Sequence, residues 1–461
     1  MTAPCSQRAA RIVASDAVSL AARSLSPAAR VLPAPRWRGG FNLLVPVSLS
    51  NTRWYARVKL QSFGPRGLHE RLMANEVATL GLLSSLAPGL APRALVPEQI
   101  GAPAPSPPLT GGTELLFFVQ PVEGRPVHDH PAAFTPAQFA RLIHDLAGVY
   151  VRLAGRRFTR IGSLLSPAGG VGPLSGPAGT TVRPVFFDAP RGPFRTARER
   201  YLAQIDHVLQ AIERGWASPD AVGTYVLHLE LRGLVERCAE MGEEGPTFLT
   251  HGDDRGDHIL VRGDGSIAGV IDWELAYTAP LAEAVSPRFL LASSNALSPL
   301  EEALCAALAA RGHPELAEAI PRGRKYLRLN LLLGAGVHEL DGARVWLVQD
   351  AFGEARRPPG TLRAWLKEAE ARWAQHEGLG RVRQGVDPAA ARRARHFLVE
   401  LERRELARRG SEPKPEPAAV ERDDWEPAPP AEVQKLRPAG LLRKLSTRAL
   451  GRWRGATAAA S

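Results

Sequence analysis

Cysteine is nearly absent from this chain of 461 residues, which contains only Cys5, Cys238 and Cys305. None of the three lies near another in the sequence, so their number and spacing exclude a disulfide framework and a zinc site of the usual Cys spacing. Long apolar runs are also missing, and no stretch approaches the roughly 20 residues that a membrane-spanning helix needs. These absences predict a soluble protein of a reducing compartment.

Acidic residues are absent from residues 436–461, where arginines and lysines recur. This basic end explains much of the net charge of +11 without a nucleic-acid site. Aromatic residues do not interleave with the basic clusters, which also disfavours a nucleic-acid partner. As a helix, residues 441–450 would be basic and amphipathic, which suits an anionic membrane surface or a partner groove. The alternative is a solvated tail with little helix.

The amino-terminal residues 1–30 carry four arginines and one acid, Asp16. This composition has two interpretations. The segment is either a mitochondrial transit peptide or an amphipathic helix over residues 7–26 that packs on the first part of the fold. We favour the second, and with it a cytoplasmic location, and keep mitochondria as the alternative.

The order of predicted elements indicates an α+β fold. An apolar content of 44% is typical of a globular protein, and the length suffices for two or three domains of roughly 100–200 residues each. Strands and one helix come first, and helices dominate afterwards. The predicted strands are 41–49, 53–60 and 115–119, and the predicted helices are 68–86, 136–153, 196–214, 225–241 and most of 298–408. Residues 163–195 are rich in Gly, Pro and Ser, and we expect an irregular excursion on the surface.

The most informative segment surrounds two aspartates. Asp253 lies in a tight loop opened by Gly252, and Asp272 ends the second of two short strands, 259–262 and 267–271. A hairpin with one carboxylate before its first strand and another after its second brings both to the same end. Phosphoryl transfer needs one carboxylate to orient the acceptor hydroxyl and another to hold Mg²⁺. The alternative is that both are turn and cap residues, since Asp favours such places. The order along the chain, with Asp253 in a loop, then the hairpin, then Asp272 at its end, favours the functional interpretation.

These residues resemble a known pattern. His251-Gly252-Asp253 and Ile271-Asp272-Trp273 are similar to the HGDxxxxN…IDW motif of the aminoglycoside phosphotransferase and choline kinase family. Upstream, residues 39–42 resemble the nucleotide-covering turn of its fungal branch. Residues 54–58 resemble the third strand of the family, and residues 75–80 resemble its lobe helix. The resemblance covers roughly residues 30–345.

The resemblance implies a protein-kinase-like bilobal fold, with a small β-rich N-lobe over 31–125 and a larger, mostly helical C-lobe over 126–380. A helix over 1–30 would precede them. A helix over 381–410 and a disordered basic tail over 411–461 would follow. The implied function is an ATP- and Mg²⁺-dependent phosphotransferase that acts on a hydroxyl of a small molecule.

For the catalytic site, the resemblance implies Asp253 as catalytic base and Asp272 as a metal ligand, with His251 bracing the loop. The second metal ligand of the family is usually Asn, and here that position is His258. Mg²⁺ prefers oxygen, so His258 either binds the metal less well or marks a pseudokinase that serves as a nucleotide-binding or interaction module. We favour the active enzyme.

For the nucleotide, the resemblance implies a covering turn at Gly39, Gly40 and Asn42. Arg57 stands at the position of the phosphate-clamping cation, and Lys59 shares its strand face, so either could reach a phosphate. Glu76 is the expected ion-pair partner. The alternative is that Arg57 and Lys59 are solvated strand residues.

The acceptor pocket is expected after Asp272, from helices that include residues 298–345. The candidates by position are Tyr326, Asn330, His338 and Glu339, for each of which ordinary packing is the alternative. Glu274 is expected to be structural, and Glu283 to give indirect support to the site.

Overall fold

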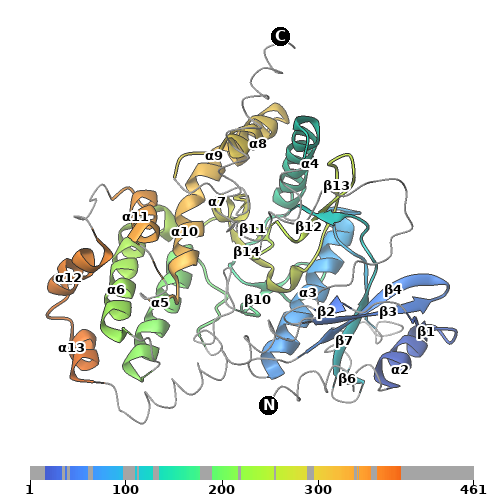
Figure 1. The fold of residues 1–461 in the computed structure, drawn as a ribbon, viewed down its shortest axis with the longest axis horizontal. Helices are drawn as coiled ribbons and strands as arrows, with labels where there is room; N and C mark the ends of the chain where they lie inside the picture. Colours follow the sequence, from blue (N-terminus) through green and yellow to red (C-terminus); the bar gives the residue numbers. More distant parts are fainter. Residues whose placement is uncertain are drawn as a thin grey trace, which may run out of the picture.

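The computed structural model describes most of the chain between residues 16 and 385. The described residues are 16–33, 37–38, 42–60, 66–96, 110–111, 114–127, 134–176, 189–215, 220–253, 256–287, 295–336, 340, 342–354 and 361–385. Figure 1 shows a sheet with helix α3 at one end of the molecule and a group of helices at the other, with short strands between them. This is the predicted α+β architecture.

The first part is an antiparallel sheet built on β3 (Asn42–Leu49), β4 (Thr52–Lys59) and β7 (Glu114–Val119). Short strands extend it: β1 (Arg30–Val31), β2 (Trp37–Arg38), β5 (Ala94–Leu95) and β6 (Thr110–Gly111). The β3–β4 turn has positive φ at Ser50 and Asn51, 49° and 63°, as a tight two-residue hairpin turn requires. The predicted strands and turn are confirmed.

Two helices cover this sheet. The described part of the predicted helix 7–26 is α2 (Asp16–Leu25), whose Val18, Ala21 and Ala22 join one core with the apolar residues of β3 and β4. Residues 1–15 lie outside the described part. Helix α3 (Arg66–Leu86) agrees with the prediction for 68–86, and its buried residues include the polar Asn75 and Glu76.

The second part is helical, as predicted. Its helices are α4 (Pro136–Ala154), α5 (Ala197–Glu213), α6 (Ala221–Arg237), α7 (Leu281–Ala284), α8 (Pro299–Ala310), α9 (Pro314–Arg322), α10 (Arg324–Leu332), α11 (Gly342–Ala351), α12 (Leu362–Arg372) and α13 (Glu377–Gln384). Helix α6 begins four residues before the predicted 225–241 because Asp220 caps it by accepting from the Gly223 amide at 2.7 Å. Among the described residues, no helix has the length and apolarity of a membrane span.

The prediction for residues 163–195 was wrong in part. Strand β9 (Ser163–Leu164) pairs with β10 (Val171–Gly172), and Leu164 and Leu174 are 3% and 2% exposed. The Gly and Pro residues shape the turns of this segment, but Leu164 and Leu174 join the main core. Residues 177–188 lie outside the described part.

Two short sheets lie between the larger parts. Strand β11 (Thr247–Thr250) pairs with β14 (Tyr277–Pro280), and β12 (Ile259–Val261) pairs with β13 (Ile267–Val270) as the predicted hairpin. Strand β8 (Arg125–Pro126) adds to β12. The Val270 amide donates to the Leu90 carbonyl at 2.6 Å, which fastens the hairpin to the chain beyond α3.

Candidate active site

In the loop after β11, the two preceding residues, His251 and Gly252, hold Asp253 in place. Gly252 has φ 80°, and a Cβ there would collide with the carbonyl oxygen of Leu275, so only glycine fits. His251 Nε2 donates to the Ile271 carbonyl at 2.8 Å, and its Nδ1 accepts from the Asp253 amide at 3.4 Å. His251 therefore ties the loop to the end of the hairpin.

Asp272 has a left-handed backbone, with φ 66° and ψ 53°, which is uncommon for a residue other than glycine. The adjacent residue fixes this turn, because Trp273 Nε1 donates to the Val270 carbonyl at 2.8 Å. Strained backbone of this kind persists where the surrounding structure holds it, and it gathers at functional sites. The Asp272 side chain keeps 30% of its surface exposed.

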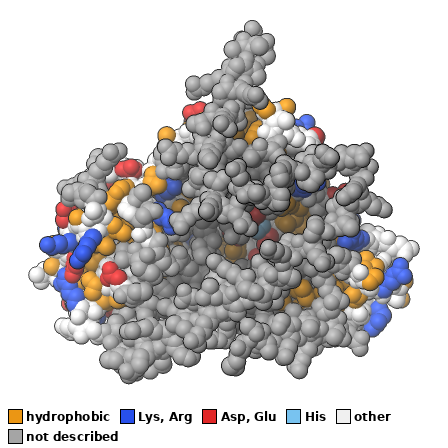
Figure 2. Space-filling model, viewed as in Figure 1, with side chains coloured by type: hydrophobic (Ala, Val, Ile, Leu, Met, Phe, Trp, Pro, Cys, Tyr) orange, Lys and Arg blue, Asp and Glu red, His pale blue; other side chains and the backbone are white. Residues whose placement is uncertain are grey.

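His258 lies between the carboxylates of this loop and hairpin. Its Nε2 is 3.4 Å from Asp253 Oδ2 and 3.3 Å from Asp257 Oδ1, while its Nδ1 is 3.8 Å from Asp272 Oδ2. The predicted convergence of the two carboxylates is therefore present in the structure. Figure 2 shows histidine and acidic side chains together near the middle of one face.

The two histidines of the site have opposite electrostatics. Their rings stack with centroids 5.1 Å apart. Burial and the neighbouring His258 lower the pKa of His251 to about 4, so it is neutral at physiological pH. Burial also opposes charge on His258, but the hydrogen bond that it donates to Asp253 and the charges of Asp272 and Asp257 raise its pKa.

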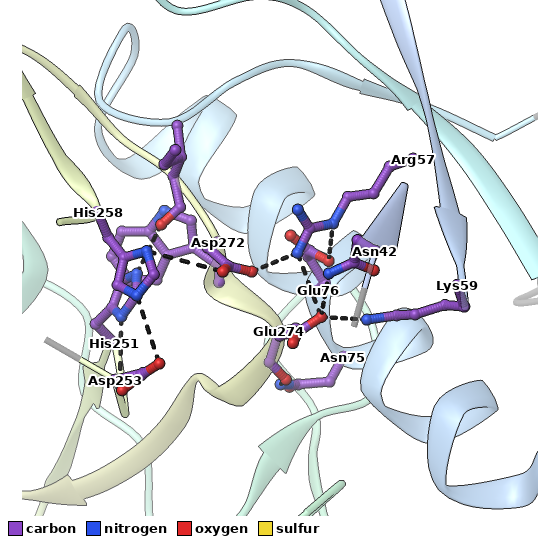
Figure 3. Close-up of polar contacts among 12 residues, drawn as sticks. Asn42, Arg57, Lys59, Asn75, Glu76, His251, Asp253, His258, Asp272 and Glu274 are labelled. Carbon is purple, nitrogen blue, oxygen red and sulfur yellow. Dashed lines mark hydrogen bonds and ion pairs between the residues drawn. The ribbon is translucent and has the colours of Figure 1, made fainter. Parts of the chain in front are cut away.

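A cluster of ion pairs lies beside the hairpin (Figure 3). Arg57 Nε is 2.9 Å from Glu76 Oε2, and its Nη2 binds both Asp272 Oδ1 and, at 3.2 Å, Glu274 Oε2. The Lys59 ammonium also binds Glu274 Oε2. The Arg57–Glu76 pair is the one expected from the sequence. The alternative that Arg57 and Lys59 are solvated does not hold, since their side chains are 10% and 0% exposed.

Glu274 is the residue that sequence reasoning undervalued. It was expected to be only structural, but it accepts from Arg57, Lys59 and Asn42, whose Nδ2 lies 3.0 Å from Oε2. A signal was present in the sequence. Two basic residues on one strand face need more than one acid if they are buried, and Glu76 alone leaves one of them without a counter-charge.

The environment shifts the pKa values of this cluster. Burial opposes the charge of Arg57, but Glu76, Asp272 and Glu274 raise its pKa. Burial likewise opposes ionisation of Asp272, but Arg57, followed by His258, lowers its pKa well below the usual range. Burial raises the pKa of Glu76 to about 7, and Arg57 offsets part of that effect.

Other expected residues have mixed outcomes. Gly39 and Gly40 lie outside the described part, as do His338 and Glu339. Of the remaining acceptor candidates, Tyr326 is 1% exposed, and Asn330 donates to Glu283 at 3.2 Å inside a buried network. Both described candidates are therefore packed into the interior.

The donor chemistry fits a magnesium ion bound together with phosphates. Within the described residues, no group of three or more His, Cys, Asp and Glu side chains forms a ready metal cage. However, the ion-pair cluster sets three carboxylates against two cations, and Asp272 is the most exposed of the three. Mg²⁺ commonly uses one or two protein carboxylates and completes its coordination with water and phosphate oxygens.

Comparison with solved structures gives distant likenesses. A thermostable variant of aminoglycoside phosphotransferase APH(4)-Ia, in complex with AMP-PNP and hygromycin B, is 19% identical with a TM-score of 0.41, covering 78% of this chain and 96% of that one. The gentamicin complex of APH(2")-IIa is 10% identical with a TM-score of 0.44, covering 74% and 96%. A macrolide 2'-phosphotransferase type I is 12% identical with a TM-score of 0.39, covering 77% and 96%.

Comparison with curated proteins gives no match. The sequence model of the phosphotransferase enzyme family, in contrast, matches residues 46–319. This match covers more than half of the chain and includes strand β4 with Arg57, helix α3 and the hairpin with both aspartates. The chain belongs to the phosphotransferase enzyme family.

Proposed function

We propose that this chain is a kinase of a small molecule, which transfers the γ-phosphoryl group of ATP to a hydroxyl with the help of Mg²⁺. One observation carries the proposal. Asp253 and Asp272 converge on His258, and Arg57 reaches the same Asp272 from the sheet. Phosphoryl transfer requires such a convergence of a base, a metal-binding carboxylate and a phosphate-binding cation.

In this proposal Asp253 is the catalytic base. Its Oδ2 orients the acceptor hydroxyl and takes its proton as the oxygen attacks the phosphorus. The His251 brace keeps the loop in position, and the neutral imidazole of His251 does not compete for the proton. Correct placement of the acceptor matters more here than basicity, because such reactions depend largely on positioning and electrostatics.

Asp272 and His258 are the proposed metal ligands, and Nδ1 is the ring nitrogen of His258 that faces Asp272. Bound Mg²⁺ would neutralise charge on the phosphates. The excess of carboxylates in the ion-pair cluster supports a bound cation.

We propose Arg57 as the cation that binds phosphate. Lys59 is fully buried against Glu274, whereas Arg57 lies at the more exposed edge, in contact with Asp272. Gly39, Gly40 and Asn42 are the proposed nucleotide-covering turn, and Glu76 orients Arg57. The two proposed lobes span residues 31–125 and 126–380.

The test is ATP turnover with and without Mg²⁺, first with water and then with a panel of small alcohols as acceptors. We expect metal-dependent turnover that Asp253→Asn lowers by about 10²–10⁴-fold, the usual contribution of a general base. Asp264→Asn is the matched control, because Asp264 lies at the tip of the same hairpin and accepts from the amide and the hydroxyl of Ser266. We expect this control to retain turnover.

Calorimetric titration with ATP separates the remaining outcomes. Metal-dependent binding without turnover of any acceptor would favour a nucleotide-binding module over an enzyme. A chain that binds no ATP in the presence or absence of Mg²⁺ would refute the proposed function.

A further inference from the structure

Glu274 connects the two parts of the molecule at the candidate site. Its side chain is 4% exposed, and a single oxygen, Oε2, accepts from Asn42 on β3 and from Arg57 and Lys59 on β4. Figure 3 shows these donors converging on Glu274 from the sheet side, while Asp272 lies beyond the far side of the Arg57 guanidinium.

The backbone of Glu274 is fixed as well. Asn75, on the buried face of α3, donates through Nδ2 to the Glu274 carbonyl at 3.1 Å and to the Ala276 carbonyl at 2.8 Å. Its Oδ1 accepts from the Leu164 amide at 3.0 Å, so the amide group of Asn75 is held at both ends. A glutamate whose backbone and side chain are both held by hydrogen bonds has little freedom to move.

We propose that Glu274 is a positioning residue that holds Arg57 in its phosphate-binding orientation. The inference rests on the proposed function. Arg57 Nη2 binds Asp272 and Glu274, and Nε binds Glu76. When Asp272 is engaged by a metal ion, its charge is shared with that ion, and Glu274 and Glu76 remain as the anchors of the guanidinium.

Lys59 has a separate part in this arrangement. Its ammonium is fully buried and binds the same oxygen of Glu274 as Arg57 does. Burying a charged group costs free energy unless an opposite charge is paired with it. Lys59 supplies that opposite charge to Glu274 even when Arg57 shares its own charge with the phosphates.

The test compares MgATP affinity in Glu274→Gln and Glu274→Asp by calorimetry. Loss of one charge-assisted hydrogen bond to Arg57 weakens MgATP binding by roughly tenfold or more in Glu274→Gln. Glu274→Asp keeps the charge and recovers part of the affinity. The loss is smaller for ATP without metal, because Asp272 then still holds Arg57; a purely structural role would not produce this difference.

Glu274→Gln also leaves the Lys59 ammonium buried without a carboxylate, which lowers stability. The double variant Lys59→Met/Glu274→Gln removes both charges. We expect it to recover denaturant stability relative to Glu274→Gln while MgATP binding stays weak, since Arg57 still lacks its anchor. This separates positioning from folding.

Glu301→Gln is the matched control. Glu301 is a buried acid that binds its own arginine, Arg324, away from the ion-pair cluster, so this variant loses stability but keeps MgATP affinity. Folded Glu274 variants with unchanged MgATP affinity would overturn the inference alone. Absence of MgATP binding by the unchanged chain would instead overturn the proposed function, and the inference with it.

Discussion

The ion pair between Arg200 and Glu283 allows a sharp prediction of stability. Arg200 Nη2 lies 2.9 Å from Glu283 Oε1 and Nη1 lies 3.1 Å from Oε2, with side chains 0% and 3% exposed. Three neutral donors also reach Oε1, namely Tyr201 Oη at 3.2 Å, Tyr277 Oη at 2.7 Å and Asn330 Nδ2 at 3.2 Å. The pair joins α5 to α7, directly after the strand that follows the site.

The perturbation is Glu283→Gln, which keeps the size of the side chain and removes its charge. Arg200 cannot lose its proton in a protein, so its charge stays buried, with the amide oxygen of the new side chain and the ring of Tyr201, 4.0 Å away, in place of the carboxylate. Removing one partner of a buried pair costs about 3–5 kcal/mol, and no cavity adds to that figure. We therefore expect a loss of about 3 kcal/mol in the free energy of unfolding.

The opposite variant is expected to be milder. In Arg200→Met, Glu283 retains three neutral donors, so we expect a loss of about 1–3 kcal/mol, that of a buried group with partial compensation. The double variant should be more stable than the sum of the two losses predicts, because neither charge is then left alone.

Urea unfolding followed by tryptophan fluorescence measures these differences, with comparison of midpoints where the slopes agree. A Glu283→Gln protein within about 0.5 kcal/mol of the unchanged chain, the range of ordinary surface substitutions, would refute the reasoning. If the loss in the double variant equals the sum of the two single losses, the claim that the two charges depend on each other is refuted.

Two further predictions concern the site. Arg57→Met should weaken MgATP binding by roughly tenfold or more. Lys59→Met should mainly lower stability, because Glu274 keeps its bond to Arg57. Calorimetry measures the affinities and urea unfolding the stabilities, and equal losses of affinity in the two variants would contradict Arg57 as the phosphate-binding cation. Gly252→Ala should lose turnover and about 1–3 kcal/mol of stability, because a left-handed backbone and a collision with the Leu275 carbonyl displace the loop that holds Asp253. An alanine variant with unchanged turnover would contradict this.

The sequence was sufficient to predict the positions of those parts of the site that are close together along the chain. Asp253 and Asp272 flank one hairpin, and short strands with a glycine turn between them leave few alternatives for where the ends lie. The same holds for β3 and β4, joined by the turn at Ser50 and Asn51. Local turn chemistry and alternation of apolar residues determine such elements.

Residues that act through distant partners could not be placed in this way. Glu274 is 217 residues from Arg57 and 215 from Lys59, so nothing in its local pattern shows that it accepts from both. Leu164 and Leu174 were misjudged for a related reason. The Gly and Pro around them indicate irregular backbone correctly, but whether irregular backbone is exposed depends on what packs over it.

The electrostatic interactions of the candidate site therefore depend on the contact between the two parts of the molecule. Both cations of the cluster come from β4. Of its acids, Glu76 comes from α3, and Asp272 and Glu274 come from the segment after β13. A shift of the sheet against the hairpin by about 1 Å would change which carboxylate Arg57 binds, and misplacement of that size can reduce a positioning-dependent rate about 10²-fold. The Asn75 contacts that fasten α3 to residues 274–276 thus affect chemistry as well as stability.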